Sequence, residues 1–102
     1  MIDDDDDIAS PIRLVIQFDL AGADLESFDA YEDEVLELLE DHGGKLYLRL
    51  RAVDRPIETH IVTFPSRGSM EAYMANPKRE RLQPLFQSTG VKMDSWEAVE
   101  PG

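Results

Sequence analysis

Hydrophobic residues recur at two spacings along this chain, and the spacing predicts the order of its secondary-structure elements. Alternation of hydrophobic and polar residues, which is typical of strands, occupies the stretches 13–18, 45–53, 58–64 and 91–99. Hydrophobic residues three or four positions apart, which are typical of amphipathic helices, occupy the stretches 25–40 and 69–88. The predicted order of elements is therefore β-α-β-β-α-β.

Residues with strong capping preferences mark the predicted helix boundaries. Asp24 fits the N-cap of the first helix, and Gly43 fits the left-handed position that follows its end. Ser69 is the expected cap of a short second helix, and Asn76-Pro77 begins a further helical segment. Pro84 lies inside that segment, where we expect a break or a kink.

The order of elements predicts how helices and strands pack. Two βαβ halves with right-handed crossovers place both helices on one face of a four-stranded antiparallel sheet. The predicted fold class is α+β, ferredoxin-like. The residues expected to face the helices are Leu14, Ile16, Phe18, Leu46, Leu48 and Leu50.

The opposite face of the sheet is predicted to be mixed, neither fully polar nor core-like. We expect it to carry Val15, Gln17, Tyr47, Arg49, Arg51 and either Trp96 or Met93. Large aromatic side chains are costly to leave in water. A second copy of the chain that covers this face would form a symmetric dimer in which two sheets meet and close a barrel. The alternative is a monomer whose sheet face is solvated.

The acidic composition narrows the classes of partner. The 102 residues carry 22 Asp and Glu against ten Lys and Arg, a formal net charge of −12. Nucleic acids and anionic membranes attract basic surfaces, so we predict that the chain binds neither. The run Asp3–Asp7 is predicted to belong to a solvated, disordered tail over residues 1–11. One folded domain is then expected over residues 12–100.

The content of cysteine and histidine limits the chemistry further. The chain has no cysteine, which excludes disulfides, thiolate metal sites and cysteine nucleophiles. Its two histidines, His42 and His60, lie far apart in sequence, so we predict no metal site and no cofactor. The longest hydrophobic stretch is too short for a membrane helix, and the acidic N-terminus differs from a secretory signal. A cytoplasmic location is therefore predicted.

Several short motifs occur in an order that resembles a known family. They are Phe28-x-x-Tyr31, His42-Gly43-Gly44, Ile61-Val62-Thr63-Phe64-Pro65-Ser66, and Met70-x-x-Tyr73 followed by Asn76-Pro77. With these motifs, residues 12–100 resemble the domain of unknown function 1330 family, within the dimeric α/β-barrel superfamily. The chain departs from that family's pattern at Lys78-Arg79-Glu80, where a tyrosine is common. The resemblance implies the ferredoxin-like fold and a homodimer, and it implies no single chemistry.

Histidine, arginine and tyrosine residues near the predicted mixed face are the candidate catalytic residues. His60 suits proton transfer near neutral pH, Arg49 suits binding of a carboxylate or an enolate, and Tyr47 suits proton donation. The candidate ligand-binding residues are Arg51, Glu58 and Trp96. Each also has a structural interpretation: a hydrogen-bonded histidine within the fold, ion pairs of arginine with acids, and aromatic residues of an interface.

These residues favour a small dimeric protein with a cavity for a small anionic or aromatic ligand, and with cofactor-independent proton transfer or oxidation as its chemistry. The alternative is a non-catalytic dimerisation or binding module. A third hypothesis assigns the acidic helix face between Glu26 and Glu40 to the capture of a basic partner. The sequence does not decide whether the chain is an enzyme.

Overall fold

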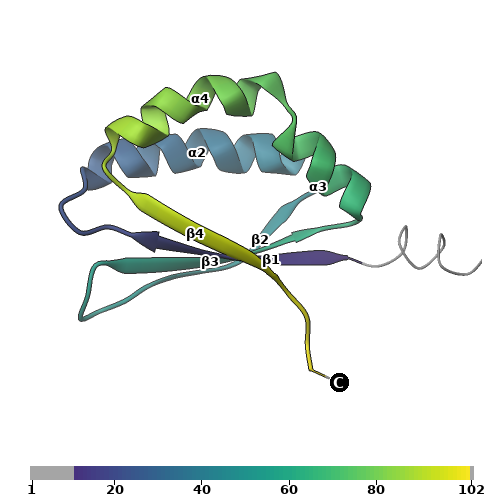
Figure 1. Cartoon of the computed structure of the whole chain (residues 1–102), viewed down its shortest axis with the longest axis horizontal. Coiled ribbons are helices and arrows are strands. Elements are labelled where there is room, and N and C mark those ends of the chain that lie inside the picture. Colours follow the sequence, from purple (N-terminus) through teal and green to yellow (C-terminus); the bar gives the residue numbers. More distant parts are fainter. Residues whose placement is uncertain (1–10, 102) are drawn as a thin grey trace, which may run out of the picture.

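The sheet forms one layer of the molecule and the helices form the other (Figure 1). The computed structural model describes residues 11–101, so the predicted tail lies outside the described residues except for Pro11. The elements are β1 (Ile12–Asp19), α2 (Leu25–Asp41), β2 (Lys45–Arg51), β3 (Ile57–Phe64), α3 (Arg67–Met74), α4 (Pro77–Ser88) and β4 (Lys92–Ala98). The strands pair antiparallel in the order β2-β3-β1-β4. This is the predicted ferredoxin-like α+β fold, with the second helical segment divided in two.

Side-chain caps fix most helix ends where the sequence predicts them. Asp24 caps α2 by accepting a hydrogen bond from the backbone N–H of Ser27 at 3.2 Å. The second helical segment begins earlier than predicted, because Ser66 is the cap of α3 and accepts a bond from the backbone N–H of Ser69 at 3.1 Å. Asn76 caps α4 as predicted. The chain does not break at Pro84, since α4 continues through it.

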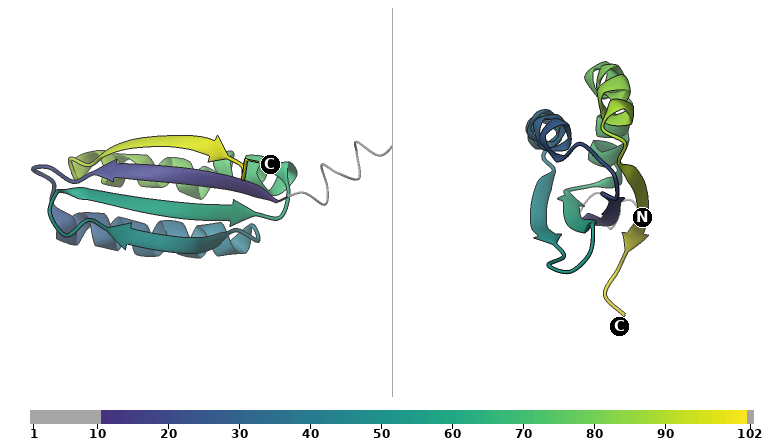
Figure 2. Two further views of the ribbon diagram at one scale, coloured as in Figure 1. Left: turned by 90° about the horizontal axis from the view of Figure 1, so that it is seen from below. Right: turned by 90° about the vertical axis from the view of Figure 1, so that its left-hand side faces the viewer.

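Two hydrophobic clusters fill the space between the layers. One consists of Ile12, Leu38, Leu39, Val62, Phe64 and Tyr73, and the other of Phe18, Leu20, Phe28 and Val91. Both join side chains of the sheet to side chains of the helices, which all lie on one face of the sheet (Figure 2). Among the described residues, no helix is both long and apolar enough to cross a membrane.

The predicted alternation of β2 is wrong beyond Leu46, because this strand contains a β-bulge. Leu46 pairs with Val62, but Leu48 pairs with Ile61, so Tyr47 is an extra residue without a partner in the ladder. An extra residue in one strand turns every following side chain of that strand to the other face of the sheet.

The bulge exchanges the two sets of side chains that the sequence assigns to β2. Arg49 and Arg51 pair with buried positions of β3, on the face that the helices cover. Leu48 and Leu50, predicted as core, lie on the outer face and are 39% and 56% exposed. The two arginines and the two leucines therefore each lie on the face of the sheet opposite to the one predicted.

The outer face of the sheet carries an apolar row that crosses all four strands. Leu48, Ile61, Val15 and Trp96 lie side by side in this row, in the register of the strand pairs. Trp96 is 45% exposed, and in the part of the chain that the structure describes no helix covers this face (Figure 2). Met93 pairs with Phe18 and lies on the helix side, so of the two residues expected on the outer face only Trp96 is there.

Candidate functional site

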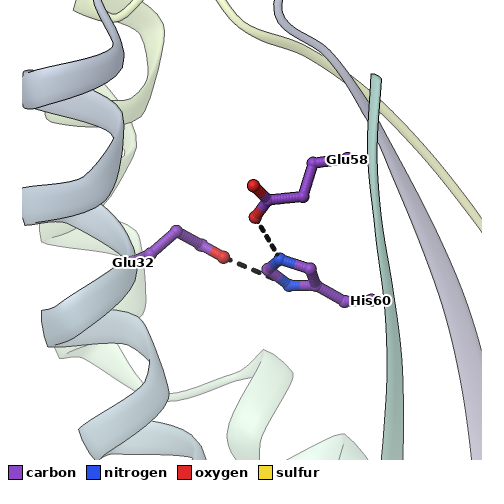
Figure 3. A group of neighbouring side chains, drawn as sticks. All are labelled: Glu32, Glu58 and His60. Carbon is purple, nitrogen blue, oxygen red and sulfur yellow. Dashed lines mark hydrogen bonds and ion pairs between the residues drawn. The ribbon is translucent and has the colours of Figure 1, made fainter. Parts of the chain in front are cut away.

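Three ionisable side chains lie together between the helix layer and the sheet. Glu32 comes from α2, and Glu58 and His60 come from alternate positions of β3 (Figure 3). Each is at most 2% exposed, although charged side chains are rarely buried so completely unless they are paired. We call Glu32, His60 and Glu58 the buried triad.

The imidazole of His60 lies between the two carboxyl groups, as Figure 3 shows. Its Nε2 is 2.6 Å from Glu58 Oε2, and its Nδ1 is 3.2 Å from Glu32 Oε1. Phe18 packs edge-on against the imidazole, with ring centroids 4.7 Å apart. Both nitrogens of the ring are therefore in contact with a carboxyl group, and an aromatic side chain packs against the ring.

Two arginines of β2 hold the carboxylate of Glu58 from its other side. Arg49 Nε donates to Glu58 Oε2 at 2.8 Å, and Arg51 donates to Glu58 Oε1 at 2.6 Å. Both guanidinium groups also donate through Nη2 to one oxygen of Asp29, at 3.3 and 3.2 Å. We call Arg49, Glu58 and Arg51 the arginine clasp. The two guanidinium groups neutralise a carboxylate whose charge would otherwise be costly to bury.

Burial and neighbouring charges move the pKa values of the triad in different directions. Burial raises the pKa of Glu32 to about 7, against an opposing effect of Arg49. Burial also lowers the pKa of His60, against the attraction of Glu58. Burial acts to raise the pKa of Glu58, but hydrogen bonds from His60 and the two arginines outweigh it, and the net shift is downward.

These directions define one arrangement of protons near neutral pH. Glu58 is ionised and accepts a hydrogen bond from Nε2–H of a neutral His60. The protonated carboxyl of Glu32 then lies 3.2 Å from the unprotonated Nδ1, close enough for its proton to pass to that nitrogen. Glu32 and His60 thus share a proton that titrates within the physiological range.

Glu32 and His60 also line a cavity of about 60 Å³ between the sheet and the helices, whereas Glu58 does not. Most of its wall is apolar, and its other polar side chains are Tyr31, Tyr73, Arg79 and Ser95. Burial raises the pKa of Tyr31 to about 12 and raises that of Tyr73, so both phenols are neutral hydrogen-bond donors at physiological pH.

The guanidinium of Arg79 is the cationic group of the cavity wall. It lies 5.3 Å from the centroid of the Tyr73 ring, a cation–π distance. Met74 and Met93 line the same cavity and are 43% and 47% exposed, so the cavity meets the surface beside these flexible side chains. The site combines a proton-sharing pair, an apolar wall and one positive charge.

The buried triad has residue types that bind metals, but its geometry does not suit one ion. Its potential ligand atoms lie within 4.8 Å of one another. The carboxyl groups, however, contact different nitrogens on opposite sides of the imidazole, and an ion can bind only one of those nitrogens. The ionised carboxylate of Glu58 is already neutralised by Arg49 and Arg51. The arrangement fits proton sharing and does not fit a metal centre.

The structure brings together four of the six predicted site residues. His60, Glu58, Arg49 and Arg51 form one network, on the helix side of the sheet and not on the outer face where the arginines were expected. Tyr47 is 73% exposed at the bulge, and Trp96 lies on the outer face, so neither reaches the cavity. The roles of all six residues in binding or catalysis stay predictions.

Glu32 is the site residue that the sequence analysis missed, because it was grouped with the acidic outer face of its helix. The helical spacing contains the signal. Glu32 lies four residues after Phe28 and three before Val35, and it therefore falls inside the apolar stripe. An acidic residue in such a stripe indicates a buried, paired carboxyl group.

Comparison with known proteins supports the fold. No protein-family model matches the chain, and no curated protein matches its sequence. A cofactor-independent oxygenase from Streptomyces nogalater, SnoaB, superposes with a TM-score of 0.76 at 13% identity, over 90% of this chain and 94% of that chain. A candidate antibiotic biosynthesis monooxygenase from Caulobacter crescentus superposes with a TM-score of 0.70 at 11% identity, over 98% and 100% of the two chains.

A third similar structure is the RPA0582 protein of unknown function from Rhodopseudomonas palustris. Its TM-score is 0.70 at 16% identity, over 96% of this chain and 89% of that chain. At such low identities the likeness shows a shared ferredoxin-like fold of the kind found in antibiotic biosynthesis monooxygenases. The narrower resemblance to the domain of unknown function 1330 family stays a prediction.

Proposed function

We propose that the chain is a homodimeric enzyme that removes a proton from a small anionic or aromatic carbonyl compound bound in the cavity, without a cofactor. The observation that supports this proposal most is the position of His60 between two carboxyl groups at the wall of an apolar cavity. A base in such a place can take a proton from carbon because water does not compete for it.

The cavity wall supplies one group that can accept the proton and another that can stabilise the enolate oxygen. Ionised Glu32, or His60 behind it, accepts the proton, and the pKa of about 7 for Glu32 matches physiological pH. The electron pair of the broken C–H bond moves onto the carbonyl oxygen and forms an enolate. Arg79 and the phenol of Tyr73 are the groups on the wall that can stabilise this oxygen. In the oxidation variant, dioxygen adds to the enolate carbon; the electron pair of the enolate forms the C–O bond, and the resulting peroxide anion takes back the proton to give a hydroperoxide.

The size of the cavity limits the ligand. At about 60 Å³ it is smaller than most ligand pockets, which span roughly 300–1,000 Å³. A ring-sized ligand therefore requires Met74 and Met93 to move aside, which their flexible, part-exposed side chains permit. The proposed substrate class is a small molecule of about one ring.

Exchange of carbon-bound protons with solvent tests the proposed reaction. Acetophenone, a small aromatic ketone, is incubated with the protein in D2O, and the loss of its methyl proton signal is followed by NMR. We expect the protein to accelerate the exchange, and Glu32→Gln to reduce that acceleration by about 100-fold or more. Glu37→Gln is the matched control, since Glu37 is exposed on the same helix and lies outside the cavity. No acceleration by the wild-type protein, or an equal loss in both variants, would contradict the proposal.

The alternative function is a non-catalytic dimerisation or binding module. The apolar row of Leu48, Ile61, Val15 and Trp96 favours it, because this row suits an interface whether or not the cavity is active. A native mass spectrum of the purified protein distinguishes the two functions. A dimer that carries a small extra mass, lost on denaturation, supports the cavity, and a dimer without one favours the module.

A further inference from the structure

The arginine clasp does not line the cavity that is lined by Glu32 and His60. Glu58, Arg49 and Arg51 line instead an open depression on the surface, together with Asp29 and Asp33. Glu32 and His60 line the cavity, and Glu58 and the two arginines do not. A ligand in the cavity therefore meets His60 and Glu32, and it does not meet the guanidinium groups.

We propose that Arg49, Glu58 and Arg51 are positioning residues that fix His60 in the Nε2–H tautomer and thereby make Nδ1, the nitrogen next to Glu32, the basic atom of the site. This inference rests on the proposed function and adds to it. It gives the arginines and Glu58 a role different from the ligand contacts and catalysis predicted from the sequence.

The hydrogen bonds of Glu58 support this assignment. Each of its oxygens accepts a bond from a guanidinium group, and Oε2 also faces Nε2 of His60 at 2.6 Å. A carboxylate held by two cations stays ionised and acts only as an acceptor. The ring nitrogen that faces it must therefore carry the proton. In a neutral imidazole the other nitrogen, Nδ1, then has the free lone pair.

The position of the clasp explains why the tautomer matters. In the opposite tautomer, Nδ1–H would point at Glu32 and the lone pair of Nε2 would face the carboxylate of Glu58, which is repulsive. The pair would then have no basic nitrogen on the cavity side. The clasp is thus the equivalent of the orienting carboxylate in a triad of nucleophile, histidine and acid.

The outer carboxylate of Asp29 holds the two arginines together at the surface. One of its oxygens accepts from both guanidinium groups, at 3.3 and 3.2 Å. Asp29 is about half exposed, so this contribution is screened by water, whereas the bonds to Glu58 are buried at the carboxylate end. Glu58 therefore has the main effect on the tautomer of His60.

The test reads the tautomer of His60 directly. The full chain is labelled with 15N-histidine, and the imidazole nitrogen shifts are recorded by NMR at about pH 6, below the pKa of Glu32. We expect the Nε2–H tautomer for His60 in the wild-type protein. In Glu58→Gln, which removes the charge and keeps the shape, we expect the ratio of Nε2–H to Nδ1–H to fall about tenfold.

Arg67→Gln is the matched control, because Arg67 also binds a carboxylate, that of Glu97, away from His60. It should leave the ratio unchanged. If His60 of the wild-type protein is in the Nδ1–H tautomer, the inference is overturned. This result needs no variant, so the test holds even if Glu58→Gln does not fold. An unchanged ratio in folded Glu58→Gln also overturns it. If the tautomers are as expected but the protein does not accelerate proton exchange of acetophenone, the proposed function is contradicted, whereas the role of the arginine clasp in fixing the tautomer is supported.

Discussion

At the scale of single residues, Glu32 replaces an apolar side chain in a helix whose buried stripe is otherwise hydrophobic. It lies between Phe28 and Val35 in the spacing of that stripe, and it is 2% exposed. The cost of burying its charged form appears as a pKa raised to about 7. A buried acid of this kind lowers the free energy of unfolding when it is ionised, and it places a titratable proton beside the cavity.

The raised pKa predicts how stability depends on pH. Between the ordinary pKa of 4.5 and about 7 the folded protein keeps the proton of Glu32 while the unfolded chain has lost it, so stability falls as pH rises through this window. Glu32→Gln removes this effect. Its gain in free energy of unfolding over wild type should be larger at about pH 8 than at about pH 5, by on the order of 3 kcal/mol.

Urea unfolding at the two pH values measures this difference. Comparison with Glu32→Gln isolates the titration of Glu32 together with its coupling to His60 and Glu58, because every other titratable group is present in both proteins. Glu37→Gln, on the exposed side of the same helix, is the control for loss of a carboxyl group and should change the free energy of unfolding by no more than about 0.5 kcal/mol. Equal gains at both pH values would mean that Glu32 is already ionised in the folded protein.

At the scale of elements, strand β2 shows where sequence patterns stop being sufficient. The sequence predicts the strand itself, its neighbours and both capped ends of α2, because these follow from local spacing and capping. It does not predict the bulge at Tyr47, because Lys45 to Arg51 alternates without a glycine or any other local sign. The bulge is favoured by a distant partner, since it turns Arg49 and Arg51 towards the carboxylate of Glu58.

Deleting Tyr47 tests the purpose of the bulge. Without the extra residue, Leu46 and Leu48 would still pair with Val62 and Ile61, now as neighbours in a regular ladder, so both arginines would stay on the helix side beside Glu58. We expect the free energy of unfolding, measured by urea denaturation, to fall by no more than about 1 kcal/mol.

Deletion of Val53 is the control for shortening the chain. Val53 is fully exposed in the connection between β2 and β3, outside the ladder. This deletion should cost about as much as deletion of Tyr47. A loss of about 3 kcal/mol or more for the Tyr47 deletion alone would show that the extra residue is needed to hold Arg49 and Arg51 on the carboxylate of Glu58.

At the scale of the whole molecule, the outer face of the sheet is left uncovered by the described residues. Its central row is apolar across all four strands, and Leu48, Leu50 and Trp96 are each more than a third exposed. Such a face suits an isologous contact with a second copy, whose matching row would cover it. The homodimer is part of the proposed function.

Trp96→Ala tests this contact. Buried tryptophans at the centre of an interface commonly contribute about 2 kcal/mol, so the dissociation constant of the dimer should rise about 30-fold. Sedimentation of the protein over a range of concentrations measures it. Val53→Ala is the control on an exposed valine outside the row. A wild-type protein that sediments as a monomer at all concentrations would contradict the homodimer.

The bulge of β2 has a consequence for how such a protein can change over generations. Because the bulge absorbs the extra residue, the loss or gain of one codon at position 47 leaves Arg49 and Arg51 on the face that they already occupy. Leu48 and Leu50 likewise keep to the outer face. The internal ionic network and the apolar outer row are therefore both insulated from a change of length in this strand.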